Sequence, residues 1–230
     1  MPKLTWDNTG ERFYEAGTDH GVLFVMTNGT YGAGVAWNGL TAVTQSPEGA
    51  EANDMYADNI KYASARSAED FKGTIEAYTY PDEFMECDGS ALLDSDIPGV
   101  YVSQQPRKTF AFSYRTQIGS DTAPLGGGPY KIHIVYGATV SPSERAYETI
   151  NDSPEGMTLS WEFETIPIPA GEGLKPTAHI EIDSRKFTTT AQQEKLQDLE
   201  DWLYGTDGEG SATGTTSALP LPAKVIELLS

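Results

Sequence analysis

The stretch RKTFAFSYRTQI, at residues 107–118, decides the fold class because its side chains alternate at a period of two. Phe110, Phe112 and Tyr114 share one face, whereas Ala111 and Ser113 share the other. Alternation of this kind is typical of a β-strand with one face packed against a core and one face in water.

Three further segments alternate in the same way, at residues 130–140, 157–165 and 177–183. In the first of them we expect a single packed face that carries Tyr130, Ile132, Ile134, Tyr136, Ala138 and Val140. Two-residue turn signals add hairpins: Asn28-Gly29 lies between residues 22–26 and 31–37, and Asp58-Asn59 between residues 54–56 and 60–63. Short strands at this spacing predict a mainly β protein, built as an antiparallel β-sandwich or barrel.

One flanking α-helix is predicted at residues 190–204, with Thr190 as N-cap, Gln193 completing a capping box and Gly205 as the stop. Residues 1–205 are therefore expected to form one β-sandwich domain that includes this helix. Residues 206–230 are expected to form a flexible linker and a C-terminal arm. The apolar end of that arm, with Val225, Ile226 and Leu228, is either a clasp onto its own domain or a contact with a neighbouring subunit.

The charge balance restricts the function. A net charge of −19 disfavours binding to nucleic-acid phosphate, because no basic patch interrupts the acidic sequence. The single cysteine, Cys87, excludes an intrachain disulfide and a multi-thiolate metal site. The opening residues lack the apolar core of a signal peptide, so we expect synthesis in the cytoplasm and no membrane partner.

The segment TIEAYTYPDEFMECDG, at residues 74–89, is the main candidate for site chemistry. Its acids could supply the paired carboxylates of a glycoside hydrolase, but acids this close in a loop that begins with proline are usually a solvated turn. His133 and His179 are expected to form hydrogen bonds at the surface or at an interface, since no histidine pair has zinc-ligand spacing. We therefore expect a protein that is not an enzyme and has no catalytic, cofactor or metal site.

Surface residues are the remaining candidates. The interface candidates in the acidic segment are Tyr78, Tyr80, Asp82 and Glu83, and those in the C-terminal arm are Val225, Ile226 and Leu228. The polar face of residues 157–165 carries Glu162 and Glu164.

Several spaced blocks carry a resemblance to a known family. They are WNGLT (37–41), YADNIKYA (56–63), EAYTYPDEFMECDG (76–89), RKTFAFSYRT (107–116), TINDSPE (149–155), KPTA (175–178), LYGTD (203–207) and LPLP (219–222). In this order they resemble the major tail tube proteins of long-tailed (siphovirus) bacteriophages of Gram-positive hosts. The similarity extends from about Trp37 to Leu229.

The resemblance implies a structural virion protein made in the host cytoplasm. Six copies would form a ring, and stacked rings would form the tail tube through which DNA passes without specific binding. Partners would be the tape measure protein, the tail terminator and the distal tail proteins. Glu162 and Glu164 would be lumen-facing acids, and the loops at residues 44–53 and 80–105 would contact the next ring.

One rival function is compatible with the same sequence pattern. A monomeric carbohydrate-binding β-sandwich, used as a binding module or adhesin, also needs alternating strands and exposed aromatic side chains. The two functions differ in oligomeric state, because only the tail tube requires self-association.

Overall fold

The computed structural model describes residues 3–49, 51–66, 68–123, 125–147, 149, 156–208 and 213–230. The protein is mainly β, as the alternating segments predict. Its strands are β1 (Phe13–Thr27), β2 (Thr30–Tyr31), β3 (Val35–Trp37), β4 (Leu40–Gln45), β5 (Glu48–Gly49), β6 (Ala52–Ala57), β7 (Ile60–Arg66), β8 (Glu69–Asp70), β9 (Lys72–Ala77), β10 (Ala91–Leu92), β11 (Tyr101–Val102), β12 (Phe110–Ser120), β13 (Tyr130–Val140), β14 (Leu159–Thr165) and β15 (His179–Asp183).

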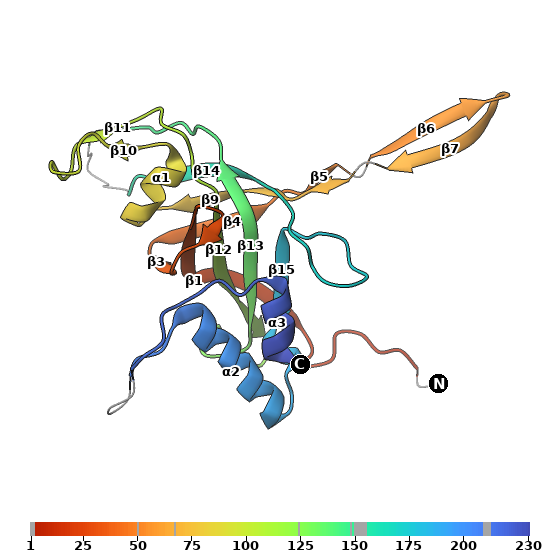
Figure 1. The fold of residues 1–230 in the computed structure, drawn as a ribbon. Helices are drawn as coiled ribbons and strands as arrows, with labels where there is room; N and C mark the ends of the chain where they lie inside the picture. Colours follow the sequence, from red (N-terminus) through yellow and green to blue (C-terminus); the bar gives the residue numbers. More distant parts are fainter. Residues whose placement is uncertain are drawn as a thin grey trace.

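A large antiparallel sheet has the strand order β2-β1-β12-β13-β14-β9-β4, with β3 on β1 and β15 on β13. The sheet curls into a β-sandwich-like body. The helices are α1 (Met85–Asp88), α2 (Thr190–Tyr204) and α3 (Pro222–Leu229), with short 3₁₀ turns at Asp82–Phe84 and Ser184–Lys186. Helices α2 and α3 lie together below the strands, and α1 lies near the opposite end (Figure 1).

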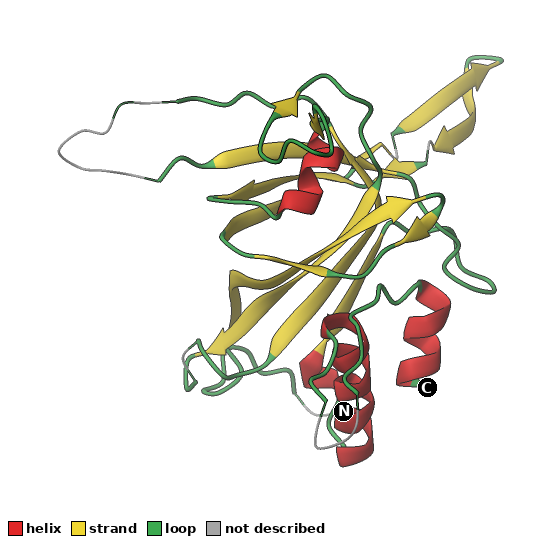
Figure 2. Ribbon diagram, turned by 60° about the vertical axis from the view of Figure 1, so that its left-hand side comes forward, coloured by secondary structure: helices red, strands yellow, loops and turns green. Residues whose placement is uncertain are grey.

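Two apolar cores lie on opposite faces of β12 and β13. The first is aromatic and packs these strands against β9 and β14, with Phe112, Trp161 and Phe163 at its centre. The second packs the other face against the helices through Ile134, Leu199 and others. Figure 2 shows α2 and α3 gathered on that side of the sheet. The prediction of one wet face is therefore wrong for both strands, because helices and strands cover them from both sides.

The strand bounds predicted for residues 130–140 are confirmed, but the single packed face is wrong. Ile134 and Tyr136 point into the helical core, whereas Ala138 and Val140 point into the aromatic core. The change occurs at Gly137, which has a φ of 61°. The register slips there: Phe112 pairs with Val135, and Phe110 pairs with Ala138. A β-bulge thus turns the strand from one layer to the other.

Both predicted two-residue hairpin turns are confirmed. Asn28 and Gly29 have φ values of 52° and 80°, and Asp58 and Asn59 have 50° and 61°. Two successive residues with positive φ are the requirement of a type I′ turn. Residues 44–53, however, are not the loop that the sequence suggested, because they contain the end of β4, the whole of β5 and the start of β6. The stretch at 80–105 is mostly loop, with η1 (Asp82–Phe84), α1 and the short β10–β11 pair inside it.

The predicted helix is present, but its cap lies one residue earlier. Thr189 is the N-cap, and its side chain and that of Gln192 make the two reciprocal hydrogen bonds of a capping box. Gly205 ends the helix with a φ of 79°. After it, the described residues are tied to the body: Thr206 and Thr215 form a β-bridge, and Ala218 N–H donates to the carbonyl of Trp202 at 2.9 Å. Residues 209–212 of the expected linker lie outside the described residues.

Candidate assembly interface

The β6–β7 hairpin carries several large apolar side chains that are exposed. It projects away from the body (Figure 1), and the strands β6 and β7 pair only with each other among the described strands. Tyr56 and Tyr62 are 70% and 74% exposed, and Met55 and Ile60 are 49% and 63% exposed. An isolated two-stranded ribbon is only marginally stable in water, so these side chains favour a partner surface.

The hairpin has a signal in the sequence, but its role does not. The turn at Asp58-Asn59 is readable from the residue types, whereas the projection of the strands from the body is not. The large apolar residues Tyr56, Ile60 and Tyr62 lie within four residues of the turn, without the clean polar–apolar alternation of a core strand. This pattern is the sequence signal for an exposed apolar hairpin.

The candidate lumen acids lie on the outer face of the sheet formed by β4, β9 and β14. Glu162 and Glu164 are exposed, while Trp161 and Phe163 between and beside them are buried, as predicted. Lys72 Nζ lies 3.1 Å from Glu164 and 3.2 Å from Glu48. The hydrogen bonds to these two acids raise the pKa of Lys72. Glu164 is therefore partly neutralised, whereas Glu162 has no cation within ion-pair distance among the described residues.

The acidic segment divides into an inward and an outward part. Asp88 is half-buried and accepts hydrogen bonds from Arg145 and from the Trp161 indole N–H, the latter at 3.2 Å. Burial raises the pKa of Asp88, while Arg145 and Trp161 act against that shift. Asp82 and Glu83 are exposed. Cys87 is buried, and that burial, with the nearby charge of Glu86, raises the pKa of its thiol to about 12.

The two tyrosines predicted for the interface differ in their surroundings. Tyr78 is 59% exposed and is free to meet another surface. Tyr80 instead packs edge-on against Trp161 and Phe84, with ring centroids 5.5 and 6.0 Å apart, and Arg145 lies over its ring. Tyr80 is thus half-buried against the aromatic core of its own chain, and Asp88 and Tyr80 share Arg145 as their partner.

The C-terminal segment packs on its own chain, which is one of the two alternatives that the sequence left open. Val225 is buried in the helical core, and Leu228 packs against that core at its edge. The buried Tyr136 hydroxyl donates to the Pro220 carbonyl at 2.7 Å. Ile226 is 54% exposed, so it alone of the three predicted arm residues presents a large open apolar surface. Pro222 at the first turn is the sequence signal for α3, since proline is favoured at that position.

His133 is buried and His179 is half-buried, so the expectation of a surface position is wrong for His133. Their rings lie parallel within 9°, with Tyr114 stacked beyond His133 and Phe71 beyond His179. His133 Nδ1 lies 3.2 Å from His179 Nε2. Burial lowers the pKa of both imidazoles, and proximity to His133 helps to bring that of His179 to about 4. The sequence showed these residues on polar strand faces, but not that a second layer covers those faces.

No group of three potential metal ligands gathers anywhere in the described ranges. The helices that the structure describes all lack the combination of length and apolarity needed to cross a bilayer.

No protein-family model matches the chain, and the search of curated proteins finds no similar sequence.

Proposed function

We propose that this chain is the major tail tube protein of a long-tailed bacteriophage, which assembles into rings that stack into a tube. The observation that carries the proposal is the β6–β7 hairpin. Its tyrosines are exposed on a ribbon whose two strands pair with no other described strand, so association with another copy would bury them. The family resemblance of the spaced sequence blocks supports the same function.

Repetition of one contact explains how such a chain builds a tube. The hairpin lies at one side of the body, and its counterpart surface must lie elsewhere on the next copy. A contact between two different patches relates each copy to the next by a fixed rotation. If repeated rotations add up to a full turn, the copies form a closed ring, and a second contact of this kind stacks the rings. Six copies per ring is the number that the resemblance implies. The tape measure protein, tail terminator and distal tail proteins would set the length and ends of the tube.

The acidic outer face of β4, β9 and β14 supports the function of a DNA conduit. Glu76, Glu162 and Glu164 give this face an excess of negative charge over the single Lys72. Repetition of such a face around a bore would repel DNA phosphate from every side, so the genome would slide without binding. The virion is the proposed location, and catalysis has no part in this function.

The first test is assembly of the purified chain, followed by negative-stain electron microscopy and sedimentation. We expect rings or tubes from the wild type. The double variant Tyr56→Ser/Tyr62→Ser should keep its melting temperature, because both side chains are exposed, but should need an about tenfold higher concentration to assemble. Tyr147→Ser, at a tyrosine that is 78% exposed elsewhere, is the matched control and should assemble normally.

Persistent monomers at high concentration would overturn the proposal. Retention of those monomers on a polysaccharide column would favour the carbohydrate-binding module instead. Equal assembly of the double variant and the wild type would show that the hairpin is not part of the interface.

A further inference from the structure

Residues 3–6 carry two large apolar side chains that nothing in the described chain covers. Leu4 is 72% exposed and Trp6 is 75% exposed. Lys3 precedes them, so this short N-terminal arm is both basic and apolar. An exposed tryptophan is unfavourable in water, and contact with a partner would bury a larger apolar area than almost any other side chain offers.

The base of the arm is fixed to the body. Gly10 N–H donates to both carboxylate oxygens of Asp121, at 3.0 and 3.1 Å. The Arg12 guanidinium donates twice to the carbonyl of Asp7, at 2.9 and 2.7 Å. These contacts hold the turn at residues 7–10, so the arm leaves the body in one direction, away from the strands (Figure 1).

A groove of about 800 Å³ lies at the other end of the molecule. Val35, Met85, Leu92 and Tyr101 contribute its apolar lining, and Asp82 and Glu83 are two of its three acidic lining residues. Leu92 and Tyr101 are 46% and 45% exposed. A third acid of the groove, Glu86, is paired with Lys108, whereas Asp82 and Glu83 have no ion-pair partner among the described residues.

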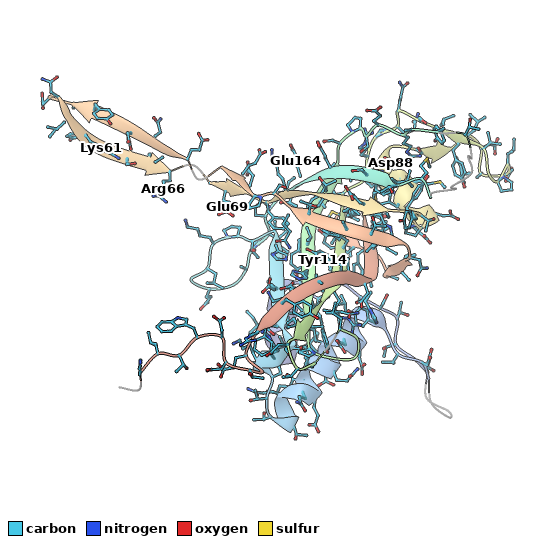
Figure 3. All side chains as sticks on the ribbon, turned by 180° about the vertical axis from the view of Figure 1, so that it is seen from behind. Lys61, Arg66, Glu69, Asp88, Tyr114 and Glu164 are labelled. Carbon is cyan, nitrogen blue, oxygen red and sulfur yellow. The ribbon has the colours of Figure 1, made fainter. Side chains whose placement is uncertain are left out.

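The arm and the groove match in chemistry but lie apart in the fold. The arm is basic and apolar, and the groove is apolar with unpaired acids. In Figure 3 the arm extends at the foot of the molecule, while the region of Asp88, which neighbours the groove, lies near the top; Figure 1 shows the same separation. Because its base is anchored, the arm meets a groove only on another copy.

We propose that the N-terminal arm of one copy inserts Leu4 and Trp6 into the groove of a second copy, with Lys3 beside Asp82 and Glu83. The donor and acceptor surfaces differ and lie at opposite ends of the chain. Such a contact is heterologous, so it propagates in one direction and does not stop at a dimer. This inference rests on the proposed self-assembly and names one contact within it.

The direct test is a disulfide between copies. A Leu4→Cys chain mixed with a Leu92→Cys chain should form a disulfide-linked heterodimer in oxidised assemblies, since the native Cys87 is buried. A mixture of Leu4→Cys and Leu174→Cys is the control, because Leu174 is 67% exposed on a different segment. We expect about tenfold more cross-linking in the first mixture than in the second. Assemblies with equal cross-linking in both would overturn the docking while leaving the proposed function intact.

A charge exchange tests the pairing of the arm with the acids. Lys3→Glu and Asp82→Lys should each raise the concentration needed for assembly several-fold, which is the size of effect expected for a charge at the rim of an interface. The combined variant should assemble at the wild-type concentration. Additive losses in the combined variant would contradict the pairing.

A peptide probe separates the docking from assembly itself. A fluorescein-labelled peptide of residues 1–8 should bind the dispersed wild-type chain and bind Asp82→Lys/Glu83→Lys about tenfold more weakly. The Trp6→Ala peptide should bind as weakly to the wild type. If the chain fails to assemble but the peptides bind as expected, the proposed function is wrong and the groove is still the receptor of the arm. If the peptide binds neither chain, the groove is not its receptor.

Discussion

His133 and His179 form a hydrogen-bonded pair whose protons can be assigned from their neighbours. The Thr116 hydroxyl donates to Glu15, so its oxygen acts as the acceptor of a hydrogen bond from the N–H at His133 Nε2, 3.0 Å away. His133 Nδ1 then carries a lone pair and accepts from His179 Nε2. Protonation of His133 would place two N–H donors face to face at 3.2 Å. The acids Glu15 and Glu181 near the pair favour protonation of His133, whereas the charge of Lys131 disfavours it. Burial outweighs the effect of the two acids, so the pKa of His133 is lowered.

This arrangement predicts acid sensitivity. The pKa of His179 is lowered in the folded chain, so the stability it contributes is present above its unfolded pKa and is lost as the pH falls from about 6.5 to about 4. We expect the free energy of unfolding to fall by about 2 kcal/mol from this residue between pH 7 and 5. His179→Phe keeps a ring stacked on Phe71 and should lose most of that fall, in denaturant titrations at both pH values.

The exposed His20 supplies the control for that measurement. His20→Gln should retain the pH dependence of the wild type, because it leaves the buried pair untouched. An unchanged fall in His179→Phe would show that other groups govern the acid sensitivity.

At the scale of elements, the bulge in β13 depends on one glycine. The Gly137 N–H donates to the Tyr31 hydroxyl at 3.0 Å, and its carbonyl accepts from Ile166 N–H at the same distance. Its φ is positive, and a Cβ placed there would lie 2.4 Å from the Ile166 carbonyl oxygen. Both the conformation and the space therefore require glycine.

Gly137→Ala should destabilise the protein by about 3 kcal/mol or more, because strain in φ adds to a clash with backbone. Gly29→Ala is the matched control: Gly29 also has a positive φ, but a Cβ there meets no atom within 4 Å. We expect it to cost about 1 kcal/mol. Thermal and urea unfolding of the two variants would measure the difference, and equal losses would mean that the contact with Ile166 relaxes freely.

The elements show which part of the fold is readable from sequence. The bounds of β13, the two type I′ turns and the buried face of α2 follow from local patterns. The change of face at Gly137 does not, because a strict period of two predicts that Tyr136 and Ala138 point the same way. Helix α3 was missed because its eight residues begin inside a proline-rich stretch. Pro222 is a local signal for its first turn, but its contact with α2 is a long-range one that no local pattern contains.

The same limit applies to the candidate assembly surface. Glu162 and Tyr78 are exposed as their positions suggest, whereas His133 is buried, and Tyr80 and His179 are half-buried, by residues far away in sequence. The groove beside Asp82 and Glu83 joins β1 and β3 to the α1–β11 region. Such a surface exists only after long-range packing, so residue spacing could point to its acids and not to its shape.

In the proposed tube, the inner and outer surfaces would differ in how easily a large reagent reaches them. Glu162 should face the bore, while Asp198 on the exposed side of α2 should face outward if the helices lie on the tube exterior. We therefore expect Glu162→Cys to react slowly with a bulky polyethylene-glycol maleimide in tubes and rapidly in dispersed chains. Asp198→Cys should react rapidly in both, as judged by gel shift, and the buried Cys87 should add little background. Rapid labelling of Glu162→Cys within intact tubes would show that the face that carries Glu162 does not line the bore.

Strand β13 belongs to both layers of the body, since its first half pairs with β15 and its second half with β14. A pull on either layer is thus carried along one continuous backbone into the other. The two halves of the body should yield together under tension, as a single mechanical unit. The hairpin strands β6 and β7 pair with no other described strand, so the hairpin should unfold separately under tension.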